Sequence, residues 1–207
     1  VIPANPGSEH PCNPPQPTTT CAFIPGQPVV RNDERFEWDI GAVYQIADSF
    51  ALFSGYASNS YPIFNTEEPQ SIGQVPETGT QVEAGLRFRQ GNWLSLSSSL
   101  FHTTRKNVYV IVLNESEVYS YRVKGWETDL SLRPVPAWNI NANFTLQDPV
   151  LTDYPQNPTQ IGKRVPSVPK RIGNVWTSYD IALPEKIGTL QLAAGLRYRS
   201  DYFGDTA

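Results

Sequence analysis

The sequence predicts an all-β fold of about eight antiparallel up-and-down strands, forming a segment of a transmembrane β-barrel. Three patterns support this prediction. Side-chain polarity alternates at every second residue, as it does in strands with one apolar and one polar face. Connections between the alternating stretches are short and long in turn, and aromatic residues gather beside the short ones. Both features are typical of barrels in an outer membrane.

The composition favours strands and turns over helices. The chain has 207 residues, including 19 prolines and 14 glycines. Its formal net charge of -4 supplies no sustained basic surface, which excludes nucleic acid as a partner. The longest apolar run, at 108–113, has six residues, whereas a membrane-spanning helix needs roughly 20. Because the chain has no methionine and no signal peptide at its start, we expect it to be a piece of a longer polypeptide.

Two hairpins are predicted in the first half of the chain. Residues 35–46 and 50–60 have strand periodicity and are joined by the short connection ADS. Residues 79–90, with the phrase VEAGLRF, and residues 93–104, with the phrase LSLSSSLF, alternate in polarity on either side of QGN. A short polar break between two such runs indicates a tight hairpin.

Two further hairpins are predicted in the second half. Residues 119–132 and 138–148 are joined by PVPA, and the phrase WNINANFTL in the second of these strands alternates without interruption. Residues 171–182 and 189–200 are joined by LPEKIG. Each of the predicted strands has about ten residues, which is the length that a tilted strand needs to cross hydrocarbon.

Long connections separate the hairpins. Residues 61–78, 105–118 and 149–170 are rich in Pro, Asn, Gln and Glu, and residues 1–34 have the same character. In outer-membrane barrels the short turns are periplasmic and the long loops are extracellular. We therefore predict an extracellular loop at 1–34 and a barrel portion at 35–207.

Aromatic residues near the short turns give a third indication of a membrane. Rings of this kind form a girdle where a barrel meets the membrane interface. The alternative is a soluble β-sandwich whose core ends are packed by the same rings. The residues concerned are Tyr44, Phe50, Trp93, Trp138 and Tyr179.

Several phrases, in their order, resemble the barrel of TonB-dependent siderophore receptors. A Tyr/Ser-rich strand end, SGYASNSYP, is followed by the Pro-Glu-x-Gly phrase at 76–79 and by the Glu-x-Gly strand at 83–85. Next come LFHTTRKNV and then VKGWETDLSLRPVPAWNINANFTLQD, which is similar to the family's Gly-x-Glu strand, proline turn and Trp-led return strand. GLRYRSDYFGDTA resembles the phrase before the last few strands of the family. The resemblance runs from about Glu34 to the C-terminus.

The resemblance implies a location, a fold and a function. It implies a segment of a barrel of about 22 strands in the bacterial outer membrane, without the plug domain and the last strands. The function implied is TonB-dependent uptake of a ferric siderophore, with the TonB complex acting through the plug region. It also implies contact with outer-membrane lipid and lipopolysaccharide. No enzymatic activity, resident cofactor or metal site is expected.

The resemblance implies that aromatic and basic side chains near the long loops bind the chelate. Rings can stack on a large polar chelate, and guanidinium or ammonium groups can pair with an anionic one. The candidate rings are Tyr61, Phe64, Tyr109, Tyr119, Tyr121 and Tyr154. The candidate cations are Arg105, Lys106 and Arg122.

The two cysteines, Cys12 and Cys21, lie in the leading proline-rich segment. We expect a disulfide between them, because the outer surface of the membrane is oxidising. Zinc bound together with His10 is the alternative, but the spacing is not that of a CxxC site and a fourth ligand is missing.

Other functions stay open at this stage. His102 near the outer end of a strand could indicate a haem receptor, although the phrases expected around such a site are missing. A structural or adhesive outer-membrane barrel would share the alternation, and so would a soluble carbohydrate-binding sandwich. Glu127 and Asp129 lie about 7 Å apart on the polar face, a spacing that suits an inverting glycosidase. Nothing marks either carboxylate for a raised pKa, so we interpret them as polar wall residues.

Overall fold

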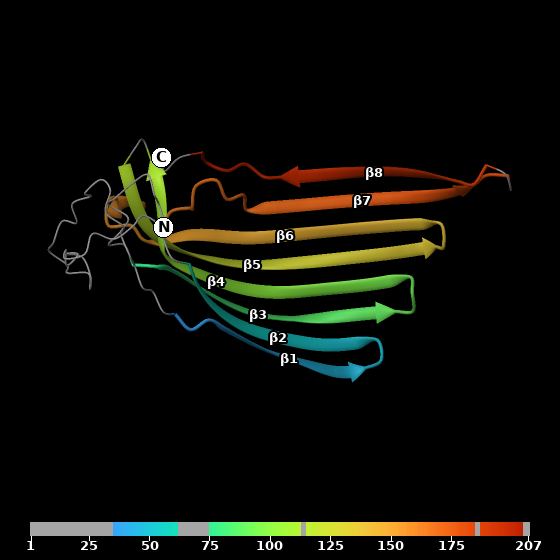
Figure 1. Ribbon diagram of the computed structural model, residues 1–207, viewed down its shortest axis with the longest axis horizontal. Coiled ribbons are helices and arrows are strands. Elements are labelled where there is room, and N and C mark those ends of the chain that lie inside the picture. Colours follow the sequence, from blue (N-terminus) through green and yellow to red (C-terminus); the bar gives the residue numbers. More distant parts are fainter. Residues whose placement is uncertain (1–34, 62–74, 113–114, 185–186, 205–207) are drawn as a thin grey trace, which may run out of the picture.

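One antiparallel sheet of eight strands contains all the strands of the described residues (Figure 1). The computed structural model describes residues 35–61, 75–112, 115–184 and 187–204. The strands are β1 (Trp38–Ala47), β2 (Phe50–Tyr61), β3 (Glu77–Gln90), β4 (Leu94–Val112), β5 (Glu115–Val135), β6 (Trp138–Asp153), β7 (Arg171–Ala182) and β8 (Thr189–Arg199). A single 3-10 turn, η2 (Pro158–Gln160), follows β6. The order of the strands in the sheet is their order in the chain, which confirms the predicted up-and-down arrangement.

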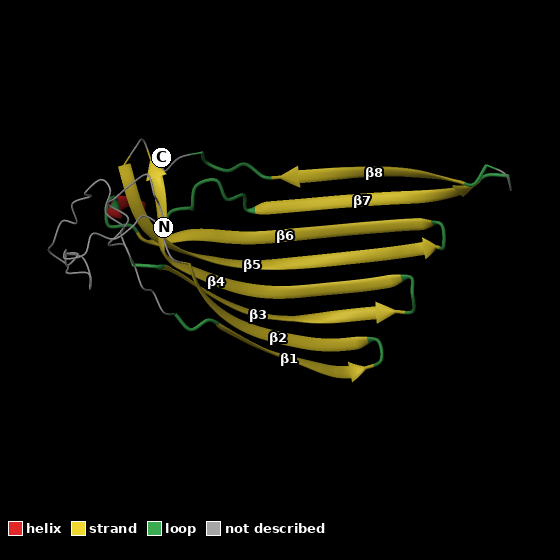
Figure 2. Cartoon of the chain, in the orientation of Figure 1, coloured by secondary structure: helices red, strands yellow, loops and turns green. Residues whose placement is uncertain are grey.

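The two ends of the sheet differ in their connections. The turns after β1, β3, β5 and β7 all lie at one end, on the right in Figure 2. We call this the short-turn end and the opposite one the long-loop end. Within the described residues, no helix is long and apolar enough to span a bilayer.

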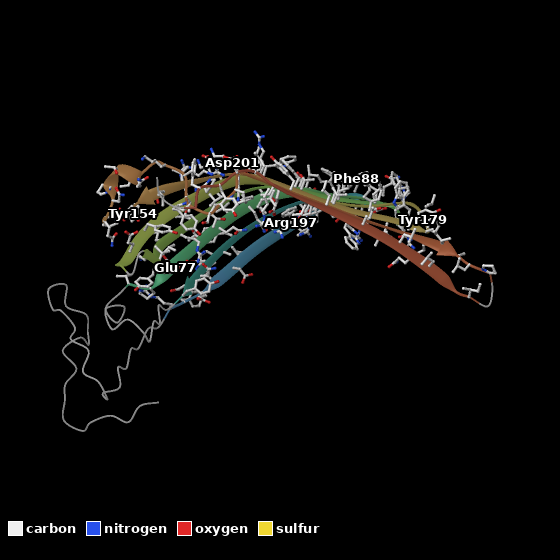
Figure 3. All side chains as sticks on the ribbon, turned by 90° about the horizontal axis from the view of Figure 1, so that it is seen from above. Glu77, Phe88, Tyr154, Tyr179, Arg197 and Asp201 are labelled. Carbon is white, nitrogen blue, oxygen red and sulfur yellow. The ribbon has the colours of Figure 1, made fainter. Side chains whose placement is uncertain are left out.

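The register of the strands sorts side chains by polarity onto two faces. Directly paired residues project to the same side of a sheet, so a row of partners can be followed from strand to strand. One row from β3 to β8 is apolar and comprises Phe88, Leu96, Leu130, Ala142, Val175 and Leu196. The adjacent row on the other side comprises Arg87, Ser97, Asp129, Asn143, Asn174 and Arg197. These rows define the apolar face and the polar face, and Figure 3 shows Phe88 and Arg197 on opposite sides of the sheet.

Polar atoms on the apolar face are paired with one another. The Trp126 indole N–H donates to Ser98 Oγ at 2.7 Å, and that hydroxyl lies 2.9 Å from the hydroxyl of Thr128. Trp138 likewise donates to Thr177 Oγ1 at 2.8 Å. An unpaired polar group in hydrocarbon costs several kcal/mol, so these lateral hydrogen bonds suit a face that contacts lipid.

Large side chains on the polar face lie against glycines of the next strand. Phe53 pairs directly with Gly85, Phe101 with Gly125, and Trp176 with Gly195. A Cβ built on Gly85 would lie 2.7 Å from the Phe53 ring, and one built on Gly195 would lie 2.6 Å from the ring of Trp176. Each glycine therefore leaves room for a ring that covers its backbone, an arrangement that also stabilises sheets by aromatic packing.

Most apolar side chains of the sheet are exposed. Leu100 on β4 is 67% exposed and Leu196 on β8 is 73% exposed. So large an apolar surface is typical of contact with a membrane or a partner. A soluble sandwich would need a second sheet packed on this one, and the described strands form a single sheet. The aromatic residues predicted for the girdle include Tyr44, which is 70% exposed.

Two of the predicted loops are wrong in part. Residues 105–112 belong to β4 and residues 115–118 belong to β5, so the described residues of this predicted loop form a strand pair. β6 also runs on to Asp153, into the predicted loop 149–170. The prediction limited each strand to the thickness of a membrane, whereas an antiparallel pair can continue into water as long as its backbone stays paired.

A bulge near the long-loop end of β4 explains why the strand extension was missed. The register with β5 shifts between Arg105 and Val108, and Asn107 adopts a positive φ of 57°. Asn tolerates this backbone conformation better than other non-glycine residues. The Asn107 side chain donates to the carbonyl of Pro76 at 3.3 Å, and its backbone N–H donates to Ser120 Oγ at 3.3 Å. Beyond the bulge, β4 and β5 bend upward at the left of Figure 1.

Three predictions fall outside the described residues. These are the extracellular loop at 1–34, the disulfide between Cys12 and Cys21 within it, and the position of Phe64. They stay predictions.

We expect Gly195→Ala to destabilise the sheet, because the new Cβ would lie 2.6 Å from the ring of Trp176. Overpacking of this kind costs about 1–3 kcal/mol of unfolding free energy. The matched control is Gly173→Ala in the same hairpin, where the nearest atom, of Phe144, is 3.5 Å away. Urea unfolding of the intact protein in lipid vesicles measures both variants. Equal unfolding free energies would contradict the packing role of Gly195.

Candidate functional site

The polar face at the long-loop end brings five of the predicted ligand-contacting residues together. Tyr61 ends β2 and pairs with Glu77 on β3. Arg105 on β4 pairs with Tyr121 on β5, in the neighbouring row. We call the group on this face the rim cluster, and it comprises Tyr61, Glu77, Arg105, Glu117, Tyr119, Tyr121 and Tyr154.

Within the rim cluster, Arg105 connects Glu77 on β3 with Tyr121 on β5. Its guanidinium forms an ion pair with Glu77 and donates to the Tyr121 hydroxyl at 3.2 Å. The same guanidinium lies 5.9 Å from the centre of the Tyr121 ring. Burial lowers the pKa of Arg105, but the hydrogen bond to Tyr121 and the charge of Glu77 outweigh it and raise the pKa above its ordinary value. The Arg105 side chain is 38% exposed, so a permanent cation stays accessible from the polar face.

Three tyrosine rings continue the cluster toward β6. The ring centres of Tyr119 and Tyr121 are 6.0 Å apart, and those of Tyr119 and Tyr154 are 5.7 Å apart. The hydroxyl of Tyr154 donates to Glu117. Burial raises the pKa of Tyr119 above its ordinary value, and the neighbouring Tyr121 adds to the effect. Tyr119 therefore presents a neutral phenol at physiological pH.

Tyr154 is a packing residue as well as a member of the cluster. It is 3% exposed and forms a small buried core with Leu151 and Val165. The segment after η2 folds back along the end of β6, where the Leu151 N–H donates to the Lys163 carbonyl at 2.9 Å. The loop at 154–170 is thus ordered against the strands, and Tyr154 fixes it there.

Three other predicted candidates lie on the opposite face. Arg122 pairs with Thr104, and Lys106 pairs with Thr78, in rows that belong to the apolar face. Tyr109 pairs with Val118 beyond the bulge and projects to the same side as Arg122. The sequence pattern indicated closeness to the loops but not the face: Arg122 and Lys106 are turned away by strand alternation, and the bulge in β4 changes the side only of Tyr109.

Two acidic members of the rim cluster were missed at the sequence level. Glu77 lies in the Pro-Glu-x-Gly phrase, which could have signalled it, because the residue begins β3 beside the loop. Glu117 lay in a segment predicted as a loop, and its contact with Tyr154 joins residues 37 positions apart. No local sequence signal gives such a contact.

From the rim cluster toward the short-turn end, the polar face is hollowed and its side chains form hydrogen bonds. Thr103 donates to Gln81 Oε1 at 3.3 Å, and the Arg87 guanidinium lies 4.6 Å from the centre of the Phe53 ring. A hollow of about 280 Å³ beside Arg87 is also lined by Asp39 and Glu83. This surface suits contact with water and polar protein groups more than with lipid.

The rim cluster offers groups that can recognise a ligand. No group of three or more His, Cys, Asp or Glu side chains that could hold a metal occurs in the described part of the chain. The rim cluster instead presents aromatic rings and one accessible guanidinium, which can bind the organic part of a ligand by stacking and by charged hydrogen bonds.

A family model described as "TonB dependent receptor-like, beta-barrel" matches residues 15–207. The chain belongs to this family. TonB-dependent receptors of this type are proteins of the outer membrane of Gram-negative bacteria, and an apolar outer face is typical of such barrels.

Several named receptors match this chain over part of their own length. The "Probable TonB-dependent siderophore receptor PiuA" of Acinetobacter baumannii is 25% identical over 197 residues, covering 85% of this chain and 26% of the relative. The catecholate siderophore receptor Fiu of Escherichia coli is 21% identical over 176 residues, covering 78% and 22%. The crystal structure of PiuA superimposes with a TM-score of 0.66 at 24% identity, over 82% of this chain and 26% of that one. The chain therefore spans about a quarter of the length of these receptors.

Tyr154→Ala is expected to release the segment 154–170 from the strands. Loss of a buried ring of this size costs about 3–5 kcal/mol. Trypsin should therefore cleave after the exposed Lys163 much faster in this variant of the intact receptor, as followed by mass spectrometry of timed digests. Tyr154→Phe keeps the ring and loses only the hydrogen bond to Glu117, so it should resemble the unaltered protein. Unchanged cleavage in Tyr154→Ala would show that the loop is anchored elsewhere.

Proposed function

We propose that this chain forms part of the wall of a receptor for TonB-dependent uptake of a ferric siderophore. The observation that carries the proposal is the match of 78–85% of the chain to relatives that are named as siderophore receptors. The rim cluster supports it, because its rings and cation lie where a ligand entering from outside would first meet the polar face. The relatives are receptors rather than enzymes, in line with a role in transport.

In the proposed orientation the long-loop end faces the outside and the short-turn end faces the periplasm. Strands β1 and β8 are the edges of the sheet, and edges with unpaired backbone groups are not tolerated in hydrocarbon. We propose that further strands of the same receptor pair with them in a barrel of about 22 strands that encloses a plug. The polar face, with Arg87, Asp129 and Arg197, would then line the interior.

The proposed role of the chain in transport is binding and guidance without covalent chemistry. Tyr61, which is 53% exposed, and Tyr121 would stack on the organic part of the chelate, while Arg105 would pair with its negative charge. In this proposal the iron stays within its chelate, because the rings and the guanidinium contact the organic part of the ligand. Energy from the TonB complex would act through the plug. The polar face between the rim cluster and the short-turn end would line a water-filled passage for the ligand.

Two alternatives keep the same fold. A haem receptor was considered because of His102, which pairs with Val82 and Lys124 on the apolar face and is thus turned away from the polar face. A structural or adhesive barrel would need no ligand at the rim cluster. The binding experiment below separates both from the proposed function.

Arg105→Gln is expected to weaken binding of an anionic ferric chelate by about tenfold or more, because a hydrogen bond to a charged group contributes about 1.5–3 kcal/mol. Arg122→Gln is the matched control, since it removes a cation of the adjoining strand on the opposite face. Fluorescence titration of the intact receptor with a ferric tris-catecholate, a ferric hydroxamate and haem gives the dissociation constants.

Equal weakening by the two substitutions would overturn the role of the rim cluster. Binding of haem without binding of either ferric chelate would select the haem receptor. Absence of binding for all three ligands, together with normal insertion in the membrane, would favour the structural barrel.

A further inference from the structure

Three tyrosine rings of the rim cluster lie in a row on the polar face. The ring centres of Tyr121 and Tyr119 are 6.0 Å apart, those of Tyr119 and Tyr154 are 5.7 Å apart, and the ring planes are inclined by 43° and 59°. Tyr119 and Tyr121 are half-buried, whereas Tyr154 is buried. The face of an accessible tyrosine ring attracts a cation, and inclined rings of this kind are the elements from which ammonium-binding cages are built.

One end of the row already binds a cation of the protein itself. The guanidinium of Arg105 lies 5.9 Å from the centre of the Tyr121 ring and forms an ion pair with Glu77. Figure 3 shows Glu77 and Tyr154 together at the long-loop end of the sheet. A ring and a carboxylate thus hold a cation jointly at this end, because cation–π attraction and charge pairing act on it at the same time.

The other end of the row also has a carboxylate. Glu117 precedes Tyr119 by two residues on β5, which is a step of about 7 Å along the same face. The hydroxyl of the buried Tyr154 donates to this carboxylate and fixes its position. Among the described residues, no lysine or arginine forms an ion pair with Glu117. A ring and an oriented carboxylate are therefore available there for the cation of a ligand.

The surroundings of the rim cluster favour a cation as well. On β1 to β5 the polar face carries Asp39, Glu83 and Glu127 between the rows of Arg105 and Arg87. No lysine or arginine among the described residues of these strands projects to the same face in this interval. A surface of one charge sign raises the local concentration of the opposite charge. A chelate with a separate positive group would therefore be attracted more strongly than one that is only anionic.

We propose that the rim cluster recognises a ferric chelate that carries a protonated amine in addition to its anionic iron-binding groups. The ammonium group would lie between the Tyr119 ring and the Glu117 carboxylate. Arg105 would pair with the anionic oxygens at the other end of the tyrosine row, and Tyr154 is the positioning residue for Glu117. The inference rests on the proposed function and adds to it the charge pattern of the ligand.

The test uses two ferric chelates, a trihydroxamate and a tris-catecholate, each with a primary amine at one end. Each is also prepared with the amine acetylated, which removes the positive charge and leaves the iron-binding groups unaltered. Fluorescence titration of the intact receptor gives the dissociation constants. Acetylation should weaken binding by about tenfold, because the amine loses a charged hydrogen bond and a cation–π contact together.

Variants of the receptor locate the group that recognises the amine. Glu117→Gln should remove most of the difference between the free and acetylated forms, and its amide oxygen can still accept from Tyr154. Tyr119→Leu should reduce the difference, whereas Tyr119→Phe keeps the ring and should preserve it. The matched control is Asp129→Asn, which removes an exposed carboxylate of the same face in the row of Arg87.

The outcomes separate this inference from the proposed transport function. Equal binding of the free and acetylated forms, or tighter binding of the acetylated ones, would overturn the inference and leave a role in chelate uptake in place. An equal effect of Glu117→Gln and Asp129→Asn would do the same. Absence of binding for all four compounds would overturn both the inference and the proposed function.

Discussion

A strand that crosses hydrocarbon must pair every backbone N–H and C=O with another strand, because an unpaired group there costs several kcal/mol. Between its strands the sheet of this chain meets that requirement with an antiparallel ladder from β1 to β8, and among the described residues the outer edges of β1 and β8 have no partner strand. Once the ladder is fixed, the period of two assigns each side chain to one of two faces. The register of the ladder then decides the polarity of each face. It also decides where a glycine is tolerated and on which face each residue of the rim cluster lies.

The two faces of the sheet accommodate polar and apolar side chains in different ways. On the lipid-facing side, indole and hydroxyl groups such as Trp126 and Ser98 pair with each other, so that hydrocarbon meets only apolar surface. On the other side, rings such as Phe101 lie over glycines of the neighbouring strand, and charged groups such as Arg87 remain accessible. The same strands can therefore serve as a membrane anchor and as a polar wall without a conventional core.

The region beyond the membrane follows different rules from the region inside it. β4 and β5, which have 19 and 21 residues in all, continue past the apolar band of the sheet. The bulge at Asn107 redirects them. The buried core of Leu151, Tyr154 and Val165 forms at this end. Water satisfies exposed backbone groups here, so the chain can use bends, ion pairs and a folded-back loop to build a binding surface. The residues proposed to bind the ligand accordingly lie at the long-loop end.

The sequence by itself determined the eight strands, their order, the two faces and the family, because each of these follows from local alternation, turn residues and short phrases. It also determined that Tyr61, Arg105 and Tyr121 lie near the long-loop end. The tertiary structure alone decided that these three share the polar face with Glu77, whereas Arg122 and Lys106 lie on the lipid-facing side. The cause is physical: adjacent residues of a strand project to opposite faces, so the register decides which face each one joins, and the partner of a charge is chosen by this register rather than by sequence distance.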